Sequence, residues 1–247
     1  YSSGIVNNYG DINLGSGIGN VGIFVTGPNG NAINYNGRTI TIGESDTSGN
    51  RYSIGMAVKN GAVAENRGII NVTGDNGIGM YASGAGSTAT NDGNIVLNAS
   101  STTGIYVDNG ATAINNKSIT TGSGTYTNAV GVYLGKDSKL INNKGATINI
   151  NAKNGVGVYL KGGIVANYGT ITVNGASKTN NNDVDGNIIY QFTVPETGKG
   201  VGGVAIDAPA GAQTATITLN GVPQTPVVVN TKGRNPITVS ASSIGLY

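Results

Sequence analysis

Apolar and polar residues alternate in short stretches along most of this chain. In Ile40-Thr41-Ile42, Ile70-Asn71-Val72 and Ile171-Thr172-Val173, for example, every second residue is apolar. Successive side chains of a β-strand point to opposite faces, so this period of two predicts half-buried strands with Asn and Thr outside. No stretch keeps an apolar period of 3.6 residues, and Asn, Gly and Thr fill positions where a helix favours Ala, Leu, Glu or Lys. No significant helix is therefore expected.

The strands recur as one repeat array. A Gly-x-Tyr tripeptide begins at Gly79, Gly104, Gly131 and Gly157, in steps of 25, 27 and 26 residues, and related tripeptides flank this series. Such a period is typical of a solenoid, in which each repeat forms one coil. The fold class predicted is all-β, a right-handed parallel β-helix of about eight coils spanning residues 1–247. Its handedness rests on the general preference of parallel crossovers.

A second column of residues keeps the same period. An Asn stands two residues before a Gly just ahead of an alternating stretch, which we interpret as turn chemistry at a fixed corner, since Asn and Gly tolerate left-handed backbone. When coils stack, these Asn side chains are expected to form an amide ladder. The members predicted are Asn8, Asn66, Asn91, Asn143 and Asn167.

Longer steps in the array indicate insertions that leave the coil. They fall near residues 43–53, 174–200 and 221–236. Loops on a rigid scaffold are where binding residues are often found, although drift of loop length in a tolerant repeat explains them equally well. Both ends of the chain fall inside repeats, from which we expect one segment cut from a longer solenoid.

Composition narrows the function classes. Of 247 residues, 42 are Gly and 11% are charged; Cys, Trp and His are absent, and the formal net charge is +2. The 14 Lys and Arg residues are scattered, which argues against nucleic acid as a partner, because phosphate binding needs a clustered basic face. No apolar run reaches the length of about 18 residues that a membrane span requires. The absence of Cys fits an exported bacterial surface protein.

Catalysis is not expected. Without His there is no imidazole base and no Ser-His nucleophile. Glycosidases need paired carboxylates, and the acidic residues here stand singly except in Asp183-Val184-Asp185. A carbohydrate-active β-helix, such as a polysaccharide lyase or glycosidase, remains the alternative function, because carboxylates from adjacent coils could still meet in space.

One insertion carries the start of a calcium-loop pattern. Asn181, Asp183 and Asp185 supply oxygen atoms at alternate positions and are followed by Gly186. The twelfth position is Phe192, where such loops have a bidentate Glu. The alternatives are a weak calcium site and a solvated Asn-rich insertion, and no other cofactor is expected.

Alternation also predicts a column of aromatic rings on the outer surface. Phe24, Tyr106, Tyr133 and Tyr159 are expected to point outward beside an outward column of glycines, and Tyr81 continues the series. These rings form either a platform for a sugar or protein surface or a stack that only stabilises the coils. Tyr190 and Phe192, in the apolar stretch of the 174–200 insertion, are further candidate binding residues.

The repeat pattern resembles a known family. Gly55-Met56-Ala57-Val58, Ile78-Gly79-Met80-Tyr81 and Val156-Gly157-Val158-Tyr159 are similar to the passenger regions of large fusobacterial-type type V autotransporter adhesins, and the likeness weakens after Gly175. The resemblance implies a β-helical stalk exposed at the bacterial outer membrane and used in adhesion. It further implies a host-cell or bacterial surface protein or glycan as the partner of a monomeric segment.

Overall fold

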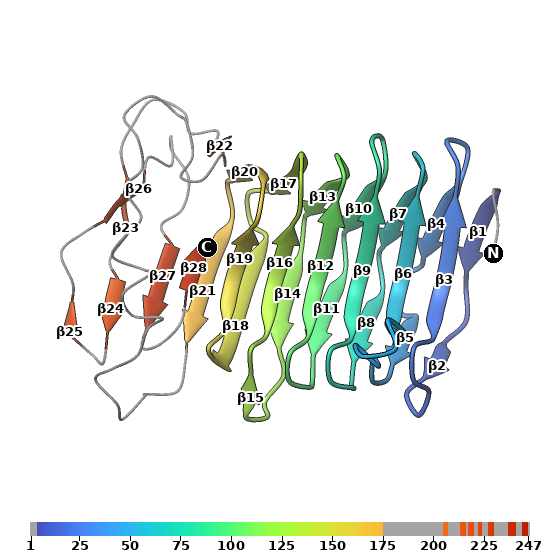
Figure 1. Cartoon of the computed structure of the whole chain (residues 1–247), viewed down its shortest axis with the longest axis horizontal. Helices are drawn as coiled ribbons and strands as arrows, with labels where there is room; N and C mark the ends of the chain where they lie inside the picture. The colour runs from blue at the N-terminus through green and yellow to red at the C-terminus, as the bar shows by residue number, and fades with distance from the viewer. Residues whose placement is uncertain are drawn as a thin grey trace.

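The chain folds into a parallel β-solenoid, seen as a rod of stacked coils in Figure 1. The computed structural model describes residues 4–173 with their side chains and, beyond them, the backbone of Asn174 and of seven short strands between Ala205 and Leu246. The described residues contain no helix and make about six turns. The expected eight coils included repeats at Gly203 and Gly245, which follow the continuously described part. The all-β solenoid prediction is confirmed.

Each complete turn contributes one strand to each of three sheets. The first sheet carries the asparagine column, because seven of its eight strands end at an Asn. Its neighbours pair in parallel, as in β7 with β10 and β10 with β13. In spatial order its strands are β1 (Ile5–Asn8), β4 (Asn31–Asn34), β7 (Val63–Asn66), β10 (Thr88–Asn91), β13 (Thr112–Asn115), β17 (Ser138–Asn142), β20 (Gly163–Asn167) and β22 (Ala205–Ile206).

The second sheet supplies a column of isoleucines to the core. Ile40, Ile70, Ile95 and Ile119 are in register and fully buried, and each buried side chain of this size contributes about 1.5–3 kcal/mol. Its strands are β2 (Ile12–Leu14), β5 (Thr39–Ile42), β8 (Ile69–Val72), β11 (Asn94–Leu97), β14 (Ser118–Thr121), β18 (Thr147–Lys153), β21 (Thr170–Asn174), β27 (Ile237–Ser240), β24 (Ile217–Leu219) and β25 (Val222–Pro223), with β15 (Tyr126–Thr127) paired to β18.

The third sheet faces the viewer in Figure 1 and carries the aromatic column. Its strands are β3 (Val21–Thr26), β6 (Ile54–Lys59), β9 (Ile78–Ser83), β12 (Thr103–Asp108), β16 (Val130–Leu134), β19 (Val156–Leu160) and β28 (Ile244–Leu246). A separate antiparallel pair joins β23 (Gln213–Ala215) to β26 (Val227–Val229).

The asparagine column is a continuous ladder, buried from Asn34 onward, whose membership differs from the prediction. Each amide nitrogen donates to the side-chain oxygen of the next Asn at 2.8–2.9 Å. Asn143 is not a member, because four residues separate β17 from β18, where two separate β7 from β8 and β10 from β11, and Asn142 takes the place. The members are Asn8, Asn34, Asn66, Asn91, Asn115, Asn142 and Asn167.

The turn interpretation of these residues is corrected except at Gly145, whose backbone is left-handed with φ 84°. The ladder asparagines end strands and do not have left-handed backbone, and neither do Gly68 and Gly93 of the same corners. A Cβ on Gly93 would lie 2.0 Å from the carbonyl oxygen of Gly68. These glycines are therefore required because successive coils approach closely at the corner.

The repeated glycines of the third sheet are buried from Gly55 to Gly157 and Gly22 is partly buried, contrary to the predicted outward column. Gly104 and Ile105 are both buried, and the register of β12 on β16 pairs Thr103 with Val130 and Ile105 with Val132, skipping the glycines. A Cβ on Gly104 would lie 2.5 Å from the Gly131 carbonyl oxygen and 2.5 Å from Cγ2 of Ile119. The strict alternation breaks here because the chain bends to bring the third sheet close to the second.

Candidate functional site

The predicted aromatic column exists on the outer face of the third sheet. Its inward neighbours are buried, whereas the rings are partly exposed. The parallel register aligns Phe24, Ala57, Tyr81, Tyr106, Tyr133 and Tyr159 in that order across six strands. Sequence reasoning named all five aromatic members but missed the significance of Ala57, which places a methyl group where its neighbours have rings.

The column is continuous on one side of Ala57. Tyr106 and Tyr133 are stacked with centroids 4.3 Å apart and planes 13° apart, and Tyr133 and Tyr159 are stacked at 5.0 Å and 7°. Tyr81 is tilted by 42° to Tyr106, at 5.6 Å. The tyrosines therefore cover one another's faces along the stacked part, and the arrangement changes at Tyr81, next to Ala57.

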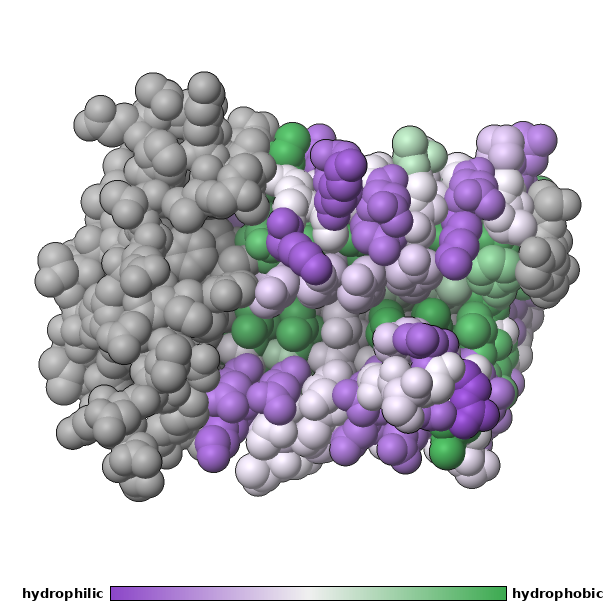
Figure 2. Space-filling model, in the orientation of Figure 1, coloured by the Kyte–Doolittle hydropathy of each residue, from purple (hydrophilic) through white to green (hydrophobic). Residues whose placement is uncertain are grey.

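A groove of about 380 Å³ lies over this interruption, and we name it the Ala57 groove. Ala57 lies on its floor with Val21, Ile54 and Ile78 at one end. Aromatic rings of Phe24, Tyr52, Tyr81 and Tyr106 also line it. Figure 2 shows apolar residues across the middle of this face, with hydrophilic residues above and below. The volume and apolar lining are typical of small-ligand sites.

The other end of the Ala57 groove carries charge. Lys59 and Asp108 line it there, at the carboxyl ends of β6 and β12. The Lys59 ammonium lies over the Tyr81 ring, 5.5 Å from the centroid, and forms no ion pair within the described part of the chain. The Tyr81 hydroxyl and the Asp108 carboxylate are 3.4 Å apart, within hydrogen-bond reach. The groove is thus apolar at one end and polar at the other.

Burial determines the ionisation of the tyrosines beside the groove. It is the largest cause that raises the pKa of Tyr106, and the neighbouring Tyr133 raises it further. Burial also raises the pKa of Tyr81, as does its contact with Asp108, although Ser83 opposes the shift. Both hydroxyls are therefore neutral and able to donate hydrogen bonds at physiological pH.

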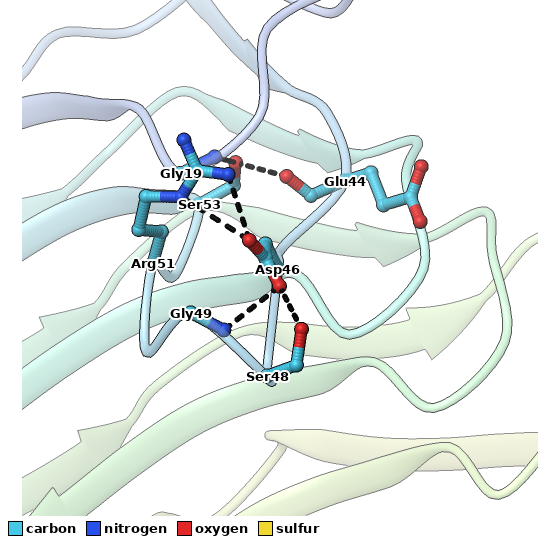
Figure 3. A network of polar contacts seen from close by, with 7 residues as sticks. All are labelled: Gly19, Glu44, Asp46, Ser48, Gly49, Arg51 and Ser53. Carbon is cyan, nitrogen blue, oxygen red and sulfur yellow. Dashed lines mark hydrogen bonds and ion pairs between the residues drawn. The ribbon is translucent and has the colours of Figure 1, made fainter.

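The insertion at residues 43–53 braces one side of the groove through Tyr52, which is 41% exposed. Figure 3 shows its polar network. Asp46 pairs with Arg51 at 2.7 Å and accepts hydrogen bonds from Ser48 and the Gly49 amide. These contacts hold the pKa of the Asp46 carboxyl below its usual range, Ser48 most of all. The network fixes the short hairpin that presents Tyr52.

This hairpin is also anchored to the coil. Ser53 Oγ donates to the Glu44 carbonyl at 2.7 Å and accepts from the Gly19 amide at 3.0 Å. Ser45 Oγ donates to the carbonyl of Asn76 in the next turn. The wall of the groove is therefore attached to coils on either side of it.

A second polar cluster, missed by sequence reasoning, runs along the corner that follows the asparagine ladder. Each member directly follows a ladder Asn, so the period of the ladder could have revealed it. Tyr9 and Tyr35 stack at 4.4 Å, and the Arg67 guanidinium lies 5.4 Å from the Tyr35 centroid. This corner column comprises Tyr9, Tyr35, Arg67, Asp92, Asn116, Asn143 and Tyr168.

Two carboxyl groups lie beside Arg67 of the corner column: Asp92 of the column itself and Glu65 of β7. Arg67 pairs with Glu65 and thereby lowers the pKa of that carboxyl. Burial raises the pKa of Asp92 most and the neighbouring Glu65 carboxyl raises it further, whereas the hydrogen bond that Asn116 donates and the charge of Arg67 lower it. Among the described residues, no group of three or more His, Cys, Asp or Glu side chains could hold a metal ion.

The remaining predicted site residues lie outside the described residues. They are Asn181, Asp183 and Asp185 of the calcium-loop pattern and Tyr190 and Phe192 of the same insertion. The structure therefore reports nothing on that pattern. In the part of the chain that is described, no helix is long and apolar enough to cross a membrane.

One family model matches the chain. Residues 1–119 match the BigA third pectate lyase-like domain. This stretch, just under half of the 247 residues, is thus similar to a bacterial surface-protein domain with a β-helix fold. It contains the whole Ala57 groove, from Val21 to Asp108. Neither the curated proteins nor the solved structures gave a match.

Proposed function

We propose that this chain is a passenger segment of an autotransporter adhesin, exposed at the bacterial outer membrane. Three observations support the proposal. The similarity of residues 1–119 is to a bacterial surface-protein domain, the coils form a stalk-like rod, and the repeats resemble autotransporter passengers. A rigid rod of this kind holds a binding face away from the membrane that anchors the parent protein.

The observation that carries the adhesive part is the Ala57 groove. Four aromatic rings, an apolar floor and two opposite charges converge on one face of a scaffold whose strands are fully paired there. Aromatic side chains supply much of the binding energy in protein interfaces and ligand sites. The proposed segment is monomeric and binds a protein or glycan on host cells or other bacteria through this face.

Attachment of the 247-residue chain to epithelial cells and to other bacteria tests this function. Changing Tyr81 and Tyr106 to Ser should lower attachment at least tenfold, because it removes two walls of the Ala57 groove. Tyr9→Ser is the matched control, since Tyr9 is 63% exposed on the corner column and outside the groove. Attachment that is equal for both variants would place the receptor site elsewhere.

The carboxyl pair on the corner column is the specific observation that favours the alternative, a carbohydrate-active enzyme. Glycosidases need two carboxyl groups that both face the sugar or a water. Here Glu65 is instead held in an ion pair by Arg67, which lowers the pKa of the Glu65 carboxyl, and Asp92 accepts a hydrogen bond from Asn116. We therefore propose binding without catalysis. Release of reducing sugar from polysaccharides that stops in Glu65→Gln would reverse this assignment.

A further inference from the structure

We propose that the Ala57 groove binds a single neutral hexopyranose ring of a glycan, inserted over Ala57 between Phe24 and Tyr81. This inference rests on the proposed adhesive function of the same face and names its ligand. It explains why the aromatic column is interrupted at one position and why that position has charged groups at one end only.

The interruption has the width of one ring. Phe24 and Tyr81 belong to strands separated by a single strand, β6, so their backbones are about 9.6 Å apart, two strand spacings. Tyrosines on neighbouring strands of the rest of the column have ring centroids 4.3–5.6 Å apart, so two strand spacings leave room for one further ring. A ring placed over Ala57 would continue the same stacking period, with the C–H face of the sugar against an aromatic face.

Elsewhere in the column a ligand ring has no such place. Tyr106 is covered by Tyr133, and Tyr133 by Tyr159, so the stacked part presents ring edges to solvent. On the Ala57 side, the face of Tyr81 lies under the Lys59 ammonium, and Ala57 itself is 3% exposed. Lys59 has an exposed side chain, and a cation–π contact at an exposed site is weak. An entering sugar can displace it.

The polar end of the groove selects hydroxyl groups. Lys59 donates only, Asp108 accepts only, and the Tyr81 hydroxyl does both. Sugar hydroxyls both donate and accept, so one ring satisfies all three groups. An apolar peptide side chain would remove them from water without partners, at a free-energy cost. The opposite charges of Lys59 and Asp108 balance, which favours a neutral sugar over a uronate or a sialic acid.

The test places a larger side chain at position 57 and measures glycan binding. The 247-residue chain is applied to a glycan array that carries oligosaccharides ending in glucose, galactose, mannose or N-acetylglucosamine, together with uronate- and sialate-terminated ones. The wild-type chain should bind neutral glycans, and Ala57→Phe should weaken this binding at least tenfold while its melting temperature stays equal or rises. Thr120→Phe adds the same ring to the outer face of β14 and should bind as the wild type does.

Ala57→Leu serves as a smaller filler should the Phe variant not fold. Three results would overturn the proposal: no glycan bound, only acidic glycans bound, or neutral binding unchanged when Ala57 is enlarged. The cell-attachment assay separates the two proposals. If attachment depends on Tyr81 and Tyr106 while no glycan binds, the receptor is a protein and the adhesive function stands without the sugar. If the wild-type chain attaches to no cell and binds no glycan, both fall.

Discussion

Two columns of stacked side chains run along this β-helix, and they differ in whether they are interrupted. The inner asparagine ladder is unbroken from Asn8 to Asn167, whereas the outer aromatic column is broken at Ala57. A missing amide in the interior would leave buried donors and acceptors without partners, which is costly. A missing ring on the surface loses only stacking, and the place over Ala57, which is 3% exposed, is covered by movable side chains such as Lys59 that a ligand can displace. The repeat is therefore kept without a break in the interior, whereas a break on the surface can form a binding site.

Breaking the inner ladder should have the largest effect. Asn91 accepts from Asn66 and donates to Asn115, so Asn91→Leu removes one ladder bond from each neighbour, although Asn66 still accepts from Asn34 and Asn115 still donates to Asn142. We expect a loss of about 2–5 kcal/mol in the free energy of unfolding, measured by urea denaturation. Asn143→Leu is the control, because Asn143 lies outside the ladder and is only half-buried; its expected cost is below about 1 kcal/mol. Equal costs would mean that the ladder does not stabilise the coils.

The glycine at the bend of the third sheet should be the next most sensitive position. In Gly104→Ala the new methyl group would meet a backbone oxygen and the Ile119 side chain, each at 2.5 Å, and overpacking of this kind costs about 1–3 kcal/mol. Gly10→Ala is matched to it, since nothing lies within 4 Å of the added methyl. Its free energy of unfolding should stay within about 0.5 kcal/mol of the wild-type value. A harmless Gly104→Ala would show that the third sheet can move away from the second.

The sequence revealed those features that follow a strict period. The isoleucine column and the outward aromatic rings were predictable, since alternation assigns each residue to a face. The glycine column was misassigned because a bend places two consecutive residues inside. A period of two in the sequence does not show where a strand bends. Asn142 and Asn143 are both asparagine, so the sequence could not show which one occupies the ladder. The Ala57 groove also depends on Tyr52, whose position is set by the Asp46–Arg51 hairpin rather than by any repeat.

Opening a gap in the outer column, or filling the existing one, should change thermal stability by a smaller amount. Tyr133 stacks on Tyr106 and Tyr159, so Tyr133→Ala removes two ring pairs, each worth about 0.5–1.5 kcal/mol beyond burial. Ala57→Phe adds ring contacts at the existing gap and should stabilise by a similar amount per pair formed. Thermal unfolding of the two variants and of the double variant measures both changes. If Ala57→Phe is strongly destabilising, the groove is too shallow to hold a ring.

The smallest effect expected is a pH dependence of the melting temperature. Of the two columns, only the outer one contributes to it, since the asparagines do not titrate. The pKa values of Tyr81 and Tyr106 are raised above the usual 10.0, chiefly by burial. A group with a raised folded-state pKa stabilises fully below its unfolded pKa and loses that contribution as pH rises through the folded value. The melting temperature should therefore fall as pH rises above about 10, where the unfolded chain releases these protons first. The double variant Tyr81→Phe, Tyr106→Phe should flatten this fall. An equally steep fall in the double Phe variant would mean that other groups cause the alkaline unfolding.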